Sequence, residues 1–305
     1  MSSELARRVA FGVVAAPIAV AIVLYGGAPL AALLAIASAL AASEFFRMAR
    51  ATGLTPIDNA GVVIAGLTPL VVHARFLHLY DPDASIGVLS LASIAMLVVL
   101  TLAIWLRGVT GKPIGAVSAT IFGAAYTGGM LSFAYGIRYH DYAFAPAAVT
   151  LGGWSFSVAS GGLLLLVPVL ATWASDTGAY VVGRTMGKHK LIPSVSPGKT
   201  IEGTIGGLIA SVLVSWVLVR WLLRPAAHLD FRSAPVGVIA YGIVVSIVAQ
   251  IGDIAESLLK RDAGVKDSST LIPGHGGVLD RVDSLLFVFP VSYVLFGWLL
   301  TWAPS

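Results

Sequence analysis

The sequence predicts an all-α, polytopic integral membrane protein with about nine transmembrane helices, and two observations carry this prediction. Hydrophobic residues make up 57% of the 305-residue chain, and charged residues only 11%. The mean hydropathy of +0.90 is well above that of ordinary soluble domains, and the apolar residues fall into long uncharged blocks. A soluble protein with a large core is therefore excluded.

The predicted spans are uncharged runs that are separated by charged residues or by Gly/Pro turns. They cover residues 9–25, 28–43, 60–74, 86–106, 114–137, 157–175, 203–219, 236–252 and 284–302. A Gly/Pro turn joins the first two, so a shallow re-entrant hairpin is the alternative for that pair. Arg7 and Arg8 precede an apolar stretch, as in a signal peptide, but no convincing cleavage site follows and two retained spans are expected.

The polar motifs divide the chain loosely into two regions. Residues 1–150 form an N-terminal transmembrane helical region, and residues 151–305 form a C-terminal transmembrane region that holds two charged loops. The chain has no cysteine, so disulfides and thiolate metal sites are excluded. Small residues near the start of the seventh span, namely Gly203, Gly206 and Gly207, would allow close contact between helices around a site.

The charged loop at 253–283 carries carboxylates suited to a metal ion, and ionisable groups beside hydrocarbon usually mark a working site. Asp280 and Asp283 are three residues apart, so on a helix both carboxylates project from one face. Asp253 ends the preceding predicted span, near the same depth. Converging carboxylates suit Mg²⁺, which completes its shell with water and phosphate. Ion pairs at a helix start, where acids favour the helix dipole, are the alternative.

Basic residues and glycines in the same loop can bind anions. Lys260, Arg261 and Lys266 form a cluster that could neutralise phosphate groups, and ordinary contact with anionic lipids is the alternative. The run Pro273–Gly277 should form a tight loop whose backbone N–H groups could make an anion-binding nest. Within it, His275 could contact phosphate or assist proton transfer, and a purely structural histidine is the alternative.

The other charged loop, at 175–203, offers a second set of polar residues. Asp176 and Glu202 lie at the ends of predicted helices, and a capping role is the alternative to a functional one. At a C-terminal helix end the Asp176 carboxylate would oppose the dipole, so a cationic partner is expected. A phosphate-binding loop at Lys199 would need a glycine where Pro193 stands, but Lys199 can still bind phosphate as a point charge.

Both loops resemble those of the phosphatidate cytidylyltransferases, the CDP-diacylglycerol synthases. The first loop has Ser-Asp-Thr-Gly-Ala-Tyr from Ser175 and Ser-Pro-Gly-Lys-Thr-Ile-Glu-Gly from Ser196. The second fits the family pattern Ser-x-x-Lys-Arg, four residues, Lys-Asp, then Pro-x-His-Gly-Gly-x-x-Asp-Arg-x-Asp. Its fixed places are filled by Ser257, Lys260, Arg261, Lys266, Asp267, Pro273, His275, Gly276, Gly277, Asp280, Arg281 and Asp283. The N-terminal half is similar only in being apolar and helical.

The resemblance implies a Mg²⁺-dependent nucleotidyltransferase that transfers CMP from CTP to phosphatidate, giving CDP-diacylglycerol and pyrophosphate in phospholipid biosynthesis. It implies catalytic roles for Lys260, Arg261, Lys266, Asp267, His275 and Arg281. Substrate-binding roles follow for Asp176, Ser196, Lys199, Thr200, Glu202, Ser257, Gly276 and Gly277. Mg²⁺ would be held by Asp253, Asp280 and Asp283. A second cation and a homo-oligomer stay open, and no nucleic-acid partner is expected.

Other functions compete with this interpretation. A CTP-dependent kinase of a lipid such as a polyprenol, or an ether-lipid cytidylyltransferase, would use the same nucleotide. A membrane transporter is the alternative of another class, but its charges should lie in mid-span. The expected place is the cell inner (cytoplasmic) membrane, crossed many times, with the active site facing the cytoplasm. Outside the two charged loops the bias of Lys and Arg toward the inside is slight, so this orientation depends on the cytoplasmic nucleotide.

Overall fold

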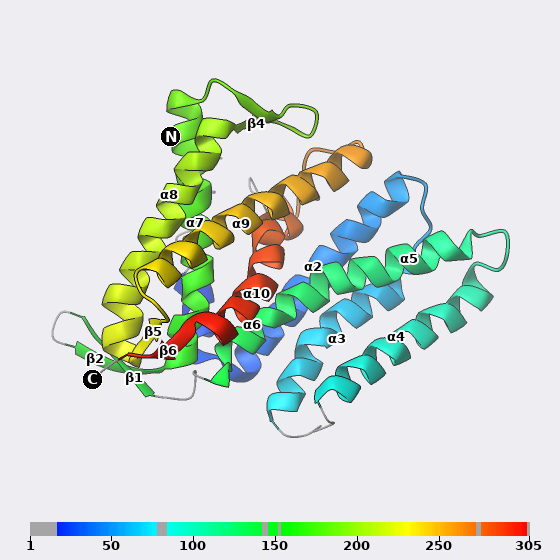
Figure 1. The fold of residues 1–305 in the computed structure, drawn as a ribbon. Coiled ribbons are helices and arrows are strands. Elements are labelled where there is room, and N and C mark those ends of the chain that lie inside the picture. Colours follow the sequence, from blue (N-terminus) through cyan, green and yellow to red (C-terminus); the bar gives the residue numbers. More distant parts are fainter. Residues whose placement is uncertain (1–16, 78–83, 142–145, 152–153, 273–275, 304–305) are drawn as a thin grey trace. The chain divides into compact units, whose positions relative to one another are not determined.

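The protein is helical over most of its length in the computed structural model, which describes residues 17–77, 84–141, 146–151, 154–272 and 276–303 (Figure 1). Residues 17–25 are helical. After them come α2 (Gly27–Ala51), α3 (Asp58–Phe76), α4 (Ala84–Leu106), α5 (Pro113–Ala124) and α6 (Met130–Arg138), with the π-helical turn η1 (Ala125–Gly129) between the last two. The later helices are α7 (Ser160–Met186), α8 (Ile201–Leu218), the π-helical η3 (Val219–Ala227), α9 (Val236–Asp262) and α10 (Leu279–Leu299).

Among the described residues, 7 helical segments are long and apolar enough to cross a membrane. They are Gly27–Ala51, Asp58–Phe76, Pro113–Arg138, Ser160–Met186, Ile201–Ala227, Val236–Asp262 and Leu279–Leu299. Each contains or overlaps one predicted span, which confirms the prediction of an all-α, polytopic membrane protein. The count of nine is not confirmed. The predicted span at 9–25 is described only from residue 17 onward, where it is helical, and the one at 86–106 corresponds to α4, which meets the criterion only as the shorter apolar helix Ser90–Leu106.

The chain folds into two compact units whose segments alternate along the sequence. The first consists chiefly of Gly27–Tyr135 and Leu259–Val282, and the second chiefly of Gly136–Leu258 and Asp283–Ser305. Both α9 and α10 therefore contribute residues to both units. The boundary expected near residue 150 lies inside the second unit.

Two helices extend well into the predicted charged loops. Helix α7 continues to Met186, so Asp176 lies within it; the expectation that Asp176 stands at a C-terminal helix end is wrong. Helix α9 continues to Asp262, so Asp253 is likewise inside a helix. Hydropathy marks where an apolar run ends, but backbone hydrogen bonding can continue a helix through polar residues beyond that point.

Three short antiparallel strand pairs, which hydropathy does not predict, complete the fold; the first two are hairpins, whereas the third joins strands far apart in the chain. They pair β1 (Pro146–Leu151) with β2 (Trp154–Ala159), β3 (Lys190–Ile192) with β4 (Ser196–Thr200), and β5 (Leu229–Phe231) with β6 (Leu300–Trp302). The second hairpin matters for function, because it carries the Ser-Pro-Gly-Lys-Thr motif and leads directly into α8.

In the first unit, an aromatic cluster joins α2, α3 and α5. The rings of Phe45 and Phe46 meet edge to face with centroids 5.5 Å apart. Gly123 of α5 and Gly61 of α3 leave the space that these rings fill: a Cβ on Gly123 would lie 2.5 Å from both of them, and one on Gly61 would also overlap Phe46. This packing fixes the turns of α2 around Glu44, as dense cores resist displacement.

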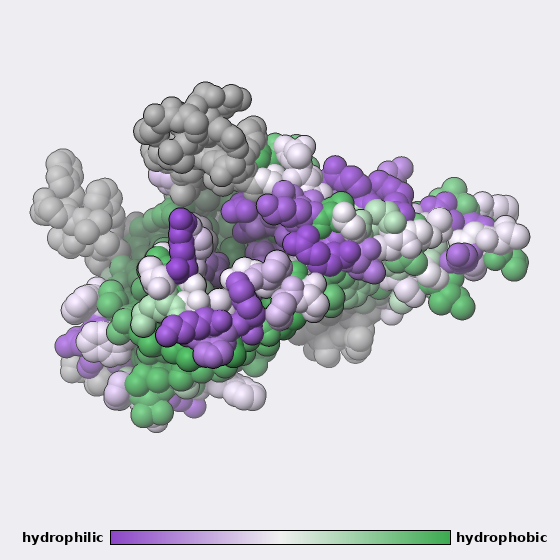
Figure 2. Space-filling view, turned by 90° about the horizontal axis from the view of Figure 1, so that it is seen from above, coloured by the Kyte–Doolittle hydropathy of each residue, from purple (hydrophilic) through white to green (hydrophobic). Residues whose placement is uncertain are grey.

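In the second unit, glycines bring α7 and α8 into close contact, as the sequence predicts for this region. A Cβ on Gly206 would lie 2.5 Å from Val182 and 2.9 Å from the carbonyl oxygen of Gly178. The opposite face of α8 exposes large apolar side chains at a helical spacing, namely Ile205, Ile209, Leu213 and Trp216. Small residues face a neighbouring helix and large apolar ones face outward, which is typical of a helix packed in lipid. In Figure 2, hydrophobic side chains (green) cover part of the surface, and hydrophilic ones (purple) cluster beside them.

Candidate active site

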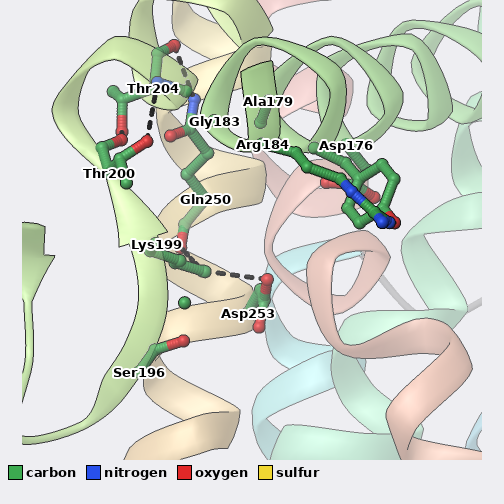
Figure 3. Close-up of a pocket in the computed structure, with 13 residues that line it drawn as sticks. Asp176, Ala179, Gly183, Arg184, Ser196, Lys199, Thr200, Thr204, Gln250 and Asp253 are labelled. Carbon is green, nitrogen blue, oxygen red and sulfur yellow. Dashed lines mark hydrogen bonds and ion pairs between the residues drawn. The ribbon is translucent and has the colours of Figure 1, made fainter. Parts of the chain in front are cut away.

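A pocket of about 520 Å³ opens in the second unit among α7, β4, α8 and α9 (Figure 3). It is lined by Asp176, Ala179, Tyr180, Gly183, Arg184, Ser196, Gly198, Lys199, Thr200, Gly203, Thr204, Gln250 and Asp253. Five residues that the sequence singles out are thus brought together: Asp176, Ser196, Lys199, Thr200 and Asp253. The pocket unites residues from the hairpin, the helix before it and a helix that begins almost 40 residues later, a grouping that chain order alone does not give.

An ion pair between Lys199 and Asp253 crosses the pocket. The Nζ of Lys199 lies 2.8 Å from Oδ2 of Asp253, and it also donates to the carbonyl oxygen of Gln250 at 3.4 Å. The hydroxyl of Ser257 donates to Oδ1 of Asp253 at 3.4 Å. The lysine side chain is 21% exposed and the aspartate 37%, so an anionic ligand can reach the pair and compete for the ammonium group.

Tyr180 and Arg184 add an aromatic ring and a second cation to the pocket wall. They lie one turn apart on α7, and Nη1 of Arg184 donates to the Tyr180 hydroxyl at 2.6 Å. The guanidinium also lies over the tyrosine ring, 5.9 Å from its centroid, as in a cation–π contact. Neither residue was predicted as a site residue, although both stand in the charged loop at 175–203.

Gln250 is a further pocket residue that the sequence analysis missed. Its Nε2 donates to Oγ of Ser246 at 3.0 Å and to the carbonyl oxygen of Thr204 at 3.4 Å. Ser246 in turn shares a 2.7 Å hydrogen bond with Ser175 of α7. This polar chain ties α7, α8 and α9 together behind the pocket. The available signal is an amide side chain inside the otherwise apolar run at 236–252.

Glu202 stabilises the β3–β4 hairpin and does not itself line the pocket. Its Oε2 accepts hydrogen bonds from the backbone N–H groups of Lys188 at 3.0 Å and His189 at 3.2 Å, and Oε1 lies 2.6 Å from Nδ1 of His189. Thr200 caps α8 by accepting a hydrogen bond from the backbone N–H of Gly203 at 3.1 Å. Together these contacts fix the strand that presents Lys199.

A second polar cluster, in the first unit, is centred on Asp280 in the first turn of α10. Its Oδ1 accepts a hydrogen bond from Nζ of Lys260 at 2.7 Å. Its Oδ2 accepts from the N–H and hydroxyl of Ser268, at 2.9 and 2.8 Å, and from the N–H of Gly277 at 2.7 Å. The side chain of Lys260 is 11% exposed and that of Asp280 is 6% exposed, so this ion pair is far more enclosed than the Lys199–Asp253 pair in the pocket. Asp280, in the first turn of α10, is thus held in an ion pair with a lysine of α9.

The remaining predicted residues lie in various surroundings. Four are exposed, namely Arg261, Lys266, Asp267 and Arg281, and Nη1 of Arg261 donates to the carbonyl oxygen of Val265 at 3.1 Å. Gly276 has a φ of +82°, which favours glycine. Asp283 accepts the N–H of Ser284 at 2.7 Å. His275 lies outside the described residues.

The two carboxylates in the pocket suit a hard cation that takes its other ligands from water and substrate, rather than one enclosed by protein ligands alone. Within the described part of the chain, no three His, Asp or Glu side chains form a group that could hold a metal ion. Mg²⁺, however, commonly takes only one or two carboxylates and completes its shell with water and substrate phosphate. Asp176 and Asp253 line the same pocket and meet that requirement. Asp280 is already bonded by four donor groups.

Comparison with known proteins identifies the family. A family model described as the cytidylyltransferase family matches residues 6–299. A phosphatidate cytidylyltransferase of Synechocystis is 32% identical over 296 residues, which is 94% of each chain. Those of Staphylococcus haemolyticus and Staphylococcus aureus are 45% and 42% identical over 160 residues, a match that spans 51% of this chain and 59% of each relative. The chain therefore belongs to the cytidylyltransferase family.

Proposed function

We propose that the protein transfers CMP from CTP to phosphatidate and releases pyrophosphate, forming CDP-diacylglycerol in the membrane. A phosphate oxygen of the lipid attacks the α-phosphorus of CTP, and the bond from that phosphorus to the bridging β-phosphate oxygen breaks. Membership of the family and the name of the Synechocystis relative support the reaction. The observation that carries it is the accessible Lys199–Asp253 pair in a pocket of about 520 Å³, next to a membrane-spanning bundle.

The pocket residues assist the reaction by neutralising the charges of the two substrates and by positioning them. Both substrates are anions, so the main barrier is their repulsion, and neutralising it while aligning them in line accelerates transfer. Lys199 exchanges its bond with Asp253 for one with a nucleotide phosphate, and Arg184 supplies a second positive charge at the wall. The backbone at Gly198 is open, because a Cβ there would meet nothing within 4 Å, so a phosphate can approach it closely. The lipid phosphate is itself the nucleophile, so no covalent intermediate is required.

Asp253 and Asp176 would hold Mg²⁺ in this pocket. A bound Mg²⁺ would neutralise phosphate charge and polarise the phosphorus–oxygen bonds. Asp253 itself keeps Lys199 in place before nucleotide binds, and the two carboxylates would fix where a cation enters. The ligand role expected for Asp280 and Asp283 stays a prediction, as does a second cation.

The enclosed Lys260–Asp280 cluster and the exposed Arg261 belong, in this proposal, to the lipid side of the reaction. Lys260 and Arg261 lie in the last turn of α9, an apolar helix long enough to span the membrane. Basic residues at such a helix end lie at the depth of lipid headgroups, where phosphatidate carries its phosphate. Arg261 is exposed and can meet a headgroup directly.

The proposal is tested with purified protein in detergent, phosphatidate, Mg²⁺ and CTP labelled in the cytidine or in the γ-phosphate. Cytidine label in the lipid product supports the transferase, whereas γ-phosphate label without cytidine would identify a lipid kinase. Asp253→Asn should abolish turnover, because it removes the partner of Lys199 and a cation ligand together. Asp262→Asn, at an exposed acid nearby on α9, is the matched control and should stay active.

A further inference from the structure

Glu44 is a buried acid that no motif in the sequence points to. It is the single acidic residue of α2, and its residue surface is 1% exposed. A buried carboxylate is costly unless several donors satisfy it, so its retention in an apolar helix calls for a specific partner. All of the partners that the structure gives it come from a segment more than 220 residues later in the chain.

Four donors surround the Glu44 carboxylate. Oε2 accepts hydrogen bonds from the hydroxyl of Ser268 at 2.9 Å and the N–H of Leu279 at 2.8 Å. Oε1 accepts from the hydroxyl of Ser269 at 2.6 Å and the N–H of Val278 at 3.1 Å. Leu279 begins α10, so the acid also lies at the positive end of a helix dipole. One side chain thus fixes both the loop after α9 and the start of α10.

Ser268 links Glu44 to Asp280. Its hydroxyl oxygen lies 2.9 Å from Oε2 of Glu44 and 2.8 Å from Oδ2 of Asp280. A hydroxyl has one hydrogen to donate, so the two carboxylates share it and the position of each depends on the other. Gly277 closes the cluster, because a Cβ there would collide with both the Ser268 hydroxyl and the Glu44 carboxylate.

We propose that Glu44 is a positioning residue for the nucleotidyl transfer, which it serves by orienting Asp280, and through it Lys260, without touching substrate. The inference rests on the proposed function. A purely structural role would need only a cap for α10, which a small polar residue provides at lower cost than a buried charge. Glu44 instead contacts the one hydroxyl that also holds Asp280. Replacing a residue that hydrogen-bonds to a metal ligand without touching the metal typically changes activity tenfold to a hundredfold, and we expect a change of that order here.

Two neighbouring serines provide a matched test, since each donates one hydroxyl to Glu44 but only Ser268 also contacts Asp280. Ser268→Ala should lower kcat for CDP-diacylglycerol formation roughly 10- to 100-fold, with the KM for CTP changed by less than about threefold. Ser269→Ala should change kcat by less than about threefold. Glu44→Gln, which keeps the size and removes the charge, should match Ser268→Ala.

The double variant Glu44→Gln/Ser268→Ala should be no slower than the more impaired single variant, because both act through one contact. Equal effects of the two serine variants, multiplicative loss in the double variant, or loss that parallels a fall in melting temperature would overturn the inference. The serine pair decides the matter if Glu44→Gln does not fold. Wild-type protein that makes no cytidine-labelled lipid would contradict the proposed function, whereas an active wild type with unimpaired Glu44→Gln and Ser268→Ala variants would contradict only this inference.

Discussion

Two aspartates of the charged segment 253–283, Asp253 and Asp280, are each held by a lysine, but their surroundings differ. Asp253 and Lys199 are partly open to solvent, so their bond can be replaced by one to a ligand. Asp280 and Lys260 are enclosed, and Asp280 has three further bonds to Ser268 and Gly277. An exposed pair contributes little to stability, whereas breaking an enclosed pair leaves an uncompensated charge. The first pair therefore suits ligand exchange, and the second suits fixed geometry.

Removal of the Lys199 ammonium should weaken nucleotide binding selectively. Lys199→Ala should raise the KM for CTP about 10- to 100-fold and more than the KM for phosphatidate, because one charge-assisted phosphate contact is worth about 1.5–3 kcal/mol. Steady-state kinetics with each substrate varied in turn measures the difference. Lys190→Ala changes a lysine of the same hairpin that does not line the pocket, and it should leave both KM values nearly unchanged.

The exposed arginine at the end of α9 should affect the lipid instead. Arg261→Ala should raise the KM for phosphatidate more than the KM for CTP, because the guanidinium lies at headgroup depth in the proposed arrangement. Mixed micelles with graded phosphatidate content provide the measurement, and Arg232→Ala, an exposed arginine before α9, is the control. Equal changes for both substrates in the Lys199 and Arg261 variants would mean that the residues act on the shared transition state.

Site residues were predictable where many polar residues cluster between apolar runs. They were not predictable where a polar residue lies within an apolar helix. Lys199 and Asp253 belong to dense polar runs, and the structure places them in one pocket. Glu44 is the one acidic residue of α2 and Gln250 the one amide of α9, and their roles depend on partners far along the chain. Periodicity and charge pattern contain no information about which distant donor an isolated acid meets, so these residues required the fold.

At the scale of elements, helix existence was predictable but helix ends and hairpins were not. Long apolar runs identify helices because only a helix satisfies its backbone within lipid. The ends of α7 and α9 lie beyond the apolar runs, since a helix can continue with polar residues that line a pocket. The hairpin β3–β4 has strands of 3 and 5 residues, too short for an alternating pattern, and Glu202 stabilises it from outside.

The contact between α7 and α8 should be sensitive to one methyl group. Gly206→Ala would place a Cβ 2.5 Å from Val182 and 2.9 Å from the backbone of Gly178, so the two helices must separate. We expect a destabilisation of about 1–3 kcal/mol, the usual cost of overpacking, and reduced activity because α7 and α8 both line the pocket. Thermal unfolding in detergent measures the first effect and the transfer assay the second.

Gly297→Ala is the matched control for this prediction. Gly297 lies in α10 of the same unit, and a Cβ there would meet nothing within 4 Å. Alanine is favoured over glycine in a helix interior by roughly 1 kcal/mol, so this variant should be as stable as the wild type or slightly more so. If Gly206→Ala were equally well tolerated, close packing of α7 on α8 would not be what shapes the pocket.

At the scale of the whole molecule, the spans determine which loops share a side of the membrane. The β3–β4 hairpin and the segment after α9 are separated by two spanning segments, Ile201–Ala227 and Val236–Asp262. An even number of crossings returns the chain to the same side, so both charged segments should face one compartment. Because the nucleotide of the proposed reaction is cytoplasmic, we expect this compartment to be the cytoplasm; the slight charge bias of the other loops does not decide the orientation.

Single cysteines can test this orientation, because the chain has none of its own. Ser194→Cys and Thr270→Cys place thiols at exposed positions in the two charged segments, and Arg232→Cys places one in the exposed link between the two intervening spans. A membrane-impermeant thiol reagent applied to intact cells should label only Arg232→Cys. In inverted membrane vesicles it should label Ser194→Cys and Thr270→Cys and spare Arg232→Cys. Opposite labelling of the two charged segments would contradict a shared compartment, and labelling of both from outside would place the reaction on the wrong side for its nucleotide.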